Sequence, residues 1–150
     1  MTLVSYFSAS GITKEYAIKL SNKLNCDLFE IEPAIRYTSE DLDWENAESR
    51  SSVEMKNKSY RPKIKNKVDN IDKYDTVFIG YPIWWYTAPT IINTFIEEND
   101  LTGKKVYLFA TSGSSSVEQS LIDLKNTYKN IDFVGAKRIT SDKDIENIIM

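Results

Sequence analysis

The strongest constraint on the fold is the alternation of short apolar runs with helical patterns along the 150-residue chain. The runs that predict strands lie at Leu3 to Phe7, Asp27 to Ile31, Thr76 to Tyr81, Lys105 to Ala110 and within Ile131 to Ile139. Strands that alternate with helices indicate a parallel sheet covered by helices on both faces. Because no internal repeat or low-complexity linker interrupts this pattern, we expect one domain over residues 1–150.

The make-up of the runs predicts the order of the strands. The first, third and fourth runs are nearly continuous in apolar residues, whereas Glu30 lies in the second and Lys137 and Arg138 lie in the fifth. Continuous apolar strands belong in the centre of a parallel sheet, where both faces are buried, and charged strands suit its edges. We therefore predict an α/β fold with a doubly wound five-stranded parallel sheet in the order 2-1-3-4-5.

Apolar residues at helical spacing predict four helices, and Ser-x-x-acid patterns predict where two of them begin. The apolar faces comprise Ile12, Tyr16, Ala17, Leu20 and Leu24; Ile91, Ile92, Phe95 and Ile96; Val117, Leu121, Leu124 and Tyr128; and Ile145, Ile148 and Ile149. Ser115-x-x-Glu118 and Ser141-x-x-Asp144 are typical of capping boxes. In the charged segment 34–74, Thr38-x-x-Asp41 has the same form, and a further helix is expected within Trp44 to Lys58.

Three loops leave the carboxyl ends of adjacent central strands, at residues 8–13, 81–86 and 111–116, and strand spacing brings them within roughly 10 Å of one another. The first loop offers hydroxyls from Ser8, Ser10 and Thr13, and Gly11 permits a tight turn that leaves amides free at a helix N-terminus. Such a loop favours a phosphate. The alternative is an ordinary turn with Ser10 as the helix cap. The loop lacks the motifs for nucleoside triphosphates and dinucleotides, which favours a phosphomonoester over a pyrophosphate.

The second and third loops favour a flat ring. The second, Tyr81-Pro82-Ile83-Trp84-Trp85-Tyr86, carries two indoles that need a flat apolar cover. They could instead fold onto the core or a partner subunit. The third, Thr111-Ser112-Gly113-Ser114, has small side chains that leave backbone amides open to a polar ring edge, although a plain serine-rich cap is the alternative. Together the three loops favour a planar heteroaromatic ring with a phosphate tail.

Composition excludes several classes of function. A net charge of -3 argues against nucleic-acid binding, which usually requires a basic face. The chain has no histidine and only one cysteine, Cys26, which excludes histidine-based hydrolase triads and internal disulfides and makes a metal site unexpected. It runs from Met1 and Thr2 directly into the first apolar run, without a basic leader or a long apolar segment. We therefore expect a cytoplasmic protein without a membrane span.

The three loops resemble the FMN-binding loops of the flavodoxins. The matching motifs are S-x-S-G-x-T, P-I-W-W-Y and T-S-G-S-S, which follow the first, third and fourth predicted strands, and the second resembles the subgroup with Trp-Trp after the proline. Flavodoxins are themselves a standard example of the 2-1-3-4-5 order. The resemblance implies that Ser8, Ala9, Ser10, Gly11, Ile12 and Thr13 hold the FMN phosphate; that Pro82, Ile83, Trp84, Trp85 and Tyr86 flank the isoalloxazine, with Trp84 stacked on it; and that Thr111, Ser112, Gly113 and Ser114 bond its pyrimidine edge.

Two departures from the flavodoxin pattern bear on function. The third loop lacks the tyrosine that often stacks on the second flavin face, and no glycine lies between Tyr81 and Ala88 in the second loop. The resemblance implies a low-potential electron carrier that exchanges electrons with redox partner proteins, namely a reductase and an electron acceptor. An NAD(P)H-dependent FMN or quinone reductase is the alternative, since the third loop leaves that flavin face open. A third possibility is a flavin-free module that binds a protein through Trp84 and Trp85.

Overall fold

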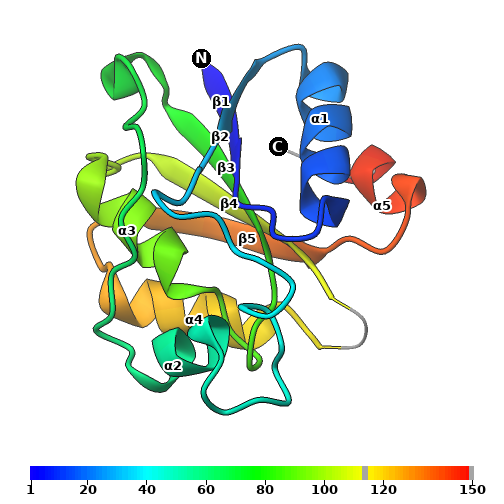
Figure 1. The fold of residues 1–150 in the computed structure, drawn as a ribbon. Coiled ribbons are helices and arrows are strands. Elements are labelled where there is room, and N and C mark those ends of the chain that lie inside the picture. Colours follow the sequence, from blue (N-terminus) through cyan, green and yellow to red (C-terminus); the bar gives the residue numbers. More distant parts are fainter. Residues whose placement is uncertain (113–114, 149–150) are drawn as a thin grey trace.

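The structure is a computed structural model that describes residues 1–112 and 115–148. Its helices and strands follow one another as β1 (Thr2–Tyr6), α1 (Ile12–Leu24), β2 (Asp27–Glu30), α2 (Arg50–Lys56), β3 (Thr76–Pro82), α3 (Thr90–Glu98), β4 (Lys105–Thr111), α4 (Glu118–Thr127), β5 (Asp132–Arg138) and α5 (Asp142–Glu146), with a 3-10 turn at Ile71–Lys73 before β3. The strands form one parallel sheet in the order β2-β1-β3-β4-β5, which confirms the predicted fold (Figure 1).

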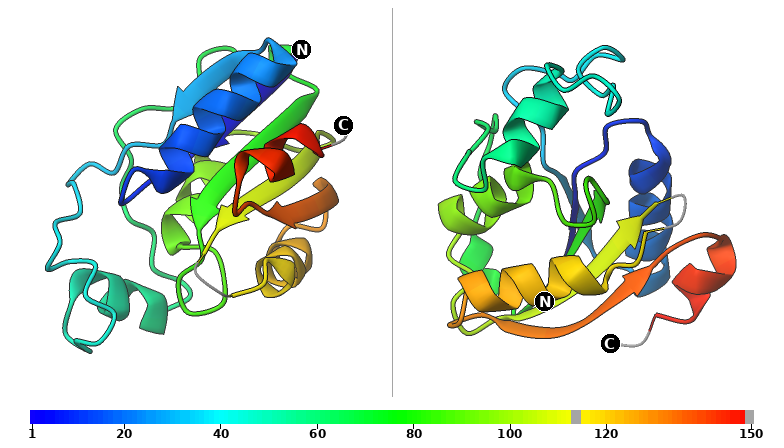
Figure 2. Two further views of the ribbon diagram at one scale, coloured as in Figure 1. Left: turned by 90° about the vertical axis from the view of Figure 1, so that its right-hand side faces the viewer. Right: turned by 90° about the horizontal axis from the view of Figure 1, so that it is seen from below.

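Alternating residues of the central strands bury two cores, one on each face of the sheet. In β3, Val77, Ile79 and Tyr81 pack in the cluster that contains α3 and α4 side chains, whereas Phe78 packs in the cluster that contains α1 and α5 side chains. Helices therefore cover both faces (Figures 1 and 2). This double burial is why the central runs carry almost no charged residue.

Gly80 is required in β3 because the ring of Phe109 on β4 lies directly over it. A Cβ atom at Gly80 would lie 2.1 Å from Cζ of Phe109, which is itself fully buried. We expect Gly80→Ala to lower the free energy of unfolding by about 1–3 kcal/mol, because the ring has no free space to move into. Urea denaturation measures this loss. The double variant Gly80→Ala/Phe109→Leu should lose less stability than the sum of the losses in the two single variants. A loss equal to that sum would contradict the contact.

Of the two predicted Ser-x-x-acid capping boxes, one is present and the other is wrong. Ser141 and Asp144 form the predicted capping box of α5. The box predicted for Ser115 and Glu118 is wrong, because α4 begins only at Glu118, whose amide donates to Ser116 Oγ at 3.1 Å. The Ser115 carbonyl instead accepts from the Ser112 hydroxyl at 2.6 Å. Of the residues predicted for the last helix, Ile149 lies outside the described part of the chain.

Segment 34–57 lies beyond the carboxyl ends of the strands, beside α3 and α4 (Figures 1 and 2). Thr38 and Asp41 form the predicted pair of hydrogen bonds. The Thr38 amide donates to Asp41 Oδ2 at 2.9 Å, and the Asp41 amide donates to Thr38 Oγ1 at 3.2 Å. Turns rather than a helix follow them. The helix expected within Trp44 to Lys58 is α2, with Ser49 as its cap. This segment is therefore placed next to the three loops.

Candidate functional site

The first loop joins β1 to α1 through a left-handed glycine. Gly11 has φ +97° and caps α1, and its amide donates to Ser8 Oγ at 3.0 Å. A side chain at this φ would be strained, which accounts for the glycine. The first amides of a helix have no partner within it, and they carry the positive end of the helix dipole. Ser8 and Ala9 are half-buried, while Ser10, Gly11 and Ile12 are exposed at the helix entrance, as an anion site requires.

The second loop is a tight turn built from bulky residues. The Trp84 amide donates to the Thr87 carbonyl at 3.0 Å and the Thr87 amide donates back at 3.1 Å. Between them, Trp85 and Tyr86 both have positive φ, at 48° and 67°, which is a type I′ turn that usually takes asparagine and glycine. Each left-handed residue of this kind costs about 1 kcal/mol. Both residues are at the surface in this turn, where Trp85 is 42% exposed and Tyr86 is 71% exposed.

Trp84 points inward and is fixed by two other aromatic rings. Its ring meets Phe7 at 5.6 Å and Tyr37 at 5.4 Å between centroids, both edge to face. Pro82 and Ile83 connect it to β3, and the Ile83 amide donates to the Thr111 carbonyl of β4 at 2.9 Å. The orientation of this indole is thus set by the core.

The third loop is tied to the first loop and to β5. Thr111 is buried at the end of β4, where its hydroxyl lies 2.8 Å from the hydroxyl of Thr13 in α1. Arg138 donates to the Ser112 side chain at 3.0 Å and to its carbonyl at 3.1 Å. The predicted residues Gly113 and Ser114 lie outside the described residues. The hydroxyls of Thr13 and Thr111 therefore join two loops of the predicted site.

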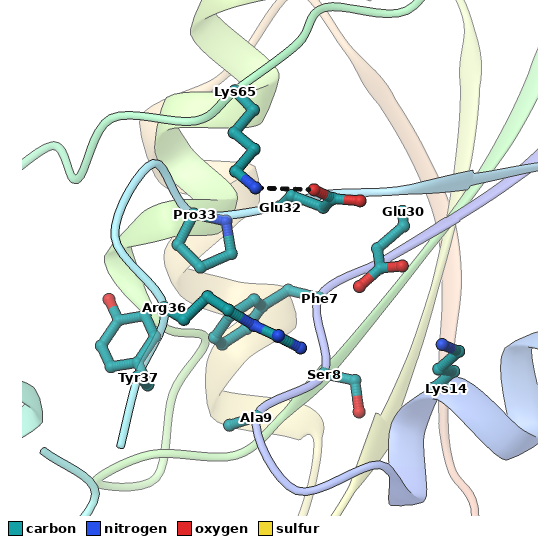
Figure 3. A pocket seen from close by; sticks show the side chains of 10 residues that line it. All are labelled: Phe7, Ser8, Ala9, Lys14, Glu30, Glu32, Pro33, Arg36, Tyr37 and Lys65. Atoms are coloured by element: carbon teal, nitrogen blue, oxygen red, sulfur yellow. Dashed lines mark ion pairs between the residues drawn. The ribbon is translucent and has the colours of Figure 1, made fainter.

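Two cavities adjoin the loops, and Trp84 lies between them. The first, of about 360 Å³, is polar and lies beside the first loop; its lining includes Ser8, Lys14, Glu30, Glu32, Arg36 and Lys65 (Figure 3). Lys65 pairs with Glu32 at 3.4 Å. Figure 3 shows the charged ends of Lys14 and Arg36 directed toward the space beside Ser8. With Lys65 paired to Glu32, these two cations face one carboxylate, that of Glu30, so the cavity is net positive where a phosphate is predicted. Sequence reasoning missed both cations.

The second cavity, of about 580 Å³, is largely aromatic and lies between the second and third loops. Its lining comprises Ile83, Trp84, Trp85, Tyr86, Ser112 and Ser115, with Leu42, Trp44 and Ser51 from segment 34–57. The volume is in the usual range for a small-molecule site. Of the residues predicted for these two loops, the cavity lining includes Ile83, Trp84, Trp85, Tyr86 and Ser112, but not Pro82 or Thr111. It also includes four residues that were not predicted for the site, namely Ser115 and the three from segment 34–57.

A buried polar cluster attaches segment 34–57 to the aromatic site. Tyr37, which contacts Trp84, donates its hydroxyl to Glu54, and the guanidinium of Arg50 lies 3.7 Å from the centroid of its ring. Arg50 Nε donates to the other Glu54 oxygen at 2.9 Å. Burial and the Glu54 carboxylate raise the pKa of Tyr37 well above its ordinary value. Glu54 is only 2% exposed, so the cluster replaces its lost hydration with hydrogen bonds.

Stability should depend on pH at both extremes and little in between. The Arg61 guanidinium, followed by the Tyr128 hydroxyl, lowers the pKa of Glu97 from 4.5, so stability is lost as acid protonates that carboxylate. Burial, aided by carboxylate partners, raises the pKa of Tyr74 and Tyr128 to about 12, so stability is lost as pH rises from about 10 through 12. The chain has no histidine, so urea midpoints should stay level between about pH 6 and 9.

Urea midpoints measured from about pH 3 to 12 test this profile. Arg61→Met should reduce the loss of stability at acidic pH. It should not change the part of the alkaline loss attributed to Tyr74, whose hydroxyl donates to Asp27 and not to a partner of Arg61. A transition between about pH 6 and 8 would contradict the assignment of the titrating groups.

Comparison with known families agrees with this architecture. The sequence profile of a family described as flavodoxin matches residues 1–149. The chain belongs to the flavodoxin family. Among curated protein sequences, none matches this flavodoxin significantly.

Solved structures include close relatives of this flavodoxin. A candidate flavoprotein from Bacteroides eggerthii is 52% identical, with a TM-score of 0.92 over 97% of this chain and 92% of its own. A second, from Bacteroides uniformis, is 44% identical, with a TM-score of 0.93 over 97% and 94%. A flavoprotein from Lactobacillus acidophilus, solved in complex with FMN, is 21% identical, with a TM-score of 0.76 over 97% and 95%, and it shares the fold.

Residues 1–112 and 115–148 contain neither a membrane-spanning helix nor a cluster of metal ligands. No helix there combines the length and the apolar character needed to cross a membrane. Over the same residues, no group of three or more acidic or cysteine side chains is arranged to hold a metal ion.

Proposed function

We propose that this flavodoxin binds FMN through its three loops and acts in the cytoplasm as a low-potential electron carrier between a reductase and an electron acceptor. Family membership supports FMN as the cofactor, as does the FMN complex of the Lactobacillus acidophilus relative. The observation that carries the proposal is the aromatic cavity of about 580 Å³ at the carboxyl edge of the sheet. The third loop, which lines part of it, is joined through the Thr111 and Thr13 hydroxyls to the start of α1, a helix entrance suited to a phosphate.

The residues present fit the two ends of FMN. At the phosphate end, the α1 amides, the Ser8 hydroxyl and the cations of Lys14 and Arg36 offer hydrogen-bond donors and positive charge. At the ring end, the second cavity combines indole surface with the buried, unpartnered hydroxyl of Ser51, whose polar atom calls for a polar edge on the ligand. A flat heteroaromatic ring with a phosphate tail satisfies both.

When bound, FMN supplies the redox chemistry, and the protein sets how easily electrons enter and leave. Aromatic surface from the second loop disfavours an electron-rich ring, whereas amides at the third loop favour added negative charge. Trp85 and Tyr86 line the second cavity and are exposed, so their rings would offer partner proteins a contact surface beside the flavin site. The net charge of -3 suits docking against basic patches. The mechanism needs no side chain as acid or base.

One observation favours the alternative, an NAD(P)H-dependent FMN or quinone reductase. The third loop, Thr111 to Ser116, contains no aromatic residue to cover the ring, so a substrate could reach that face. A reductase should consume NAD(P)H when a quinone is added, whereas a carrier should turn over little with NAD(P)H alone.

The visible absorption spectrum of the purified protein, before and after addition of FMN, tests the proposal. We expect flavin bands with quenched fluorescence, and stepwise reduction that proceeds one electron at a time. Reduction in a single two-electron step, together with NAD(P)H consumption, would favour the reductase. The absence of both bound flavin and any response to FMN would contradict the proposal and favour a flavin-free protein contact through Trp84 and Trp85.

A further inference from the structure

Trp44 is an exposed indole with no role in the core. Its side chain is 70% exposed in the turns that precede α2, yet it lines the same cavity as Trp85 and Tyr86 of the second loop. A tryptophan left in water forgoes a large burial free energy, and loops rarely hold one without a partner surface. Trp44 and the second loop thus offer aromatic surface to one shared space.

Ser51 gives an independent indication of a ligand in that cavity. It is only 2% exposed and lines the cavity, and its hydroxyl has no hydrogen-bond partner in the described part of the chain. A buried hydroxyl without a partner is unfavourable, so such groups usually bond to a bound molecule or water. The hydroxyl therefore calls for a ligand with a polar atom at its edge.

Hydrogen bonds within segment 34–57 fix the backbone that carries both residues. The Ser51 amide donates to the Asp41 carbonyl at 2.9 Å, which ties the turns around Trp44 to α2. The neighbouring Arg50 donates to Glu54 at 2.9 Å and to the Ile35 carbonyl at 2.7 Å. The position of the cavity wall is thus set before any ligand arrives, as a binding site requires.

We propose that Trp44 and Ser51 form a second wall of the flavin ring site, a role that rests on the proposed function. Trp44 covers the ring face that the third loop leaves without an aromatic residue, which closes the face that the reductase alternative requires to be open. The Ser51 hydroxyl bonds a polar atom at the ring edge. The ligand chemistry that fits this wall is a planar heteroaromatic ring with hydrogen-bonding groups on its rim. Segment 34–57 is therefore part of the binding site.

Titrations of the full chain with FMN and with riboflavin, followed by flavin fluorescence, test the role of Trp44. Trp44→Ala should raise the Kd of both ligands by the same factor, about tenfold, because the indole touches the ring and not the phosphate. Trp44→Phe should restore most of the affinity. Tyr60→Ala, which removes an exposed aromatic ring of the same region that lines neither cavity, should change neither Kd. The urea midpoint of Trp44→Ala should not move, since its side chain is exposed.

Ser51→Ala should change two quantities in opposite directions. Without a ligand, removal of an unpartnered buried hydroxyl should raise the urea midpoint. With FMN, the same variant should bind about three- to tenfold more weakly, because the ring edge loses a hydrogen bond. A purely structural serine would not give opposite signs.

The outcomes separate this inference from the proposed function. Wild-type binding of FMN with unchanged Kd values in Trp44→Ala and Ser51→Ala would overturn the second wall and leave the proposed function intact. A wild-type protein that binds neither FMN nor riboflavin would overturn both. A larger effect of Trp44→Ala on FMN than on riboflavin would place Trp44 at the phosphate and also overturn the inference.

Discussion

Replacement of Glu54 by alanine is expected to lower the free energy of unfolding by about 3 kcal/mol. The carboxylate is buried and accepts hydrogen bonds from Arg50 and Tyr37. Its removal leaves a largely buried guanidinium without its ion partner and a phenol without its acceptor, and both losses exceed the value of an exposed ion pair. Urea denaturation followed by tryptophan fluorescence measures the change.

Two further variants make the Glu54 result specific. Glu48→Ala, an exposed carboxylate in the same segment, should change stability by less than about 0.5 kcal/mol. Glu54→Gln keeps an acceptor for Tyr37 and should fall between the alanine variant and the wild type. A loss of less than about 1 kcal/mol in Glu54→Ala would show that the cluster does not hold segment 34–57 in place.

In the Trp84→Ala variant, FMN should bind about 10- to 100-fold more weakly, and flavin fluorescence should recover. Trp84 lines the aromatic cavity and is oriented by Phe7 and Tyr37, so its truncation removes ring surface and loosens its neighbours. The Kd from a fluorescence titration and the intensity at saturation are the two readouts.

The binding effect of Trp84 must be separated from its effect on folding. Trp84→Phe retains an aromatic surface and should recover part of the affinity, and urea midpoints for both variants show whether they remain folded under the titration conditions. Tyr60→Ala, outside both cavities beside the loops, should leave the Kd unchanged. Unchanged affinity and quenching in folded Trp84→Ala would contradict the stacking role.

The sheet could be predicted because a strand that is buried on both faces has a continuous run of apolar residues. β1, β3 and β4 are read from continuous apolar runs, and Glu30, Lys137 and Arg138 identify the edges. The three candidate loops followed from the strand order, since parallel strands end at one edge. Whether the loop residues bind FMN stays a prediction that the titrations above decide.

The contribution of segment 34–57 could not be predicted, because its contacts are polar and distant in sequence. Nothing local distinguishes the buried Glu54 or its half-buried partner Arg50 from the exposed charges around them. Arg36, one of the two cations beside the first loop, escaped notice for the same reason, since it reaches that cavity only through the path of the chain after β2. The other, Lys14, directly follows the loop in sequence. The prediction of Ser115 as a cap was wrong because the adjacent Ser116 has the same hydroxyl, and it is Ser116 Oγ that accepts from the Glu118 amide.

β1 and β3 pair at the centre of the sheet, although they are far apart in sequence. The Ser5 hydroxyl of β1 donates to the Phe78 carbonyl of β3 at 2.8 Å, across 73 residues. Closing so long a loop costs entropy before any contact in the pair repays it, which slows folding. During synthesis, β1 must wait until β3 has left the ribosome before the centre of the sheet can form. Segment 34–57 emerges in that interval, so its contact between Tyr37 and Trp84, which follows β3, can form only after β3 has been synthesised.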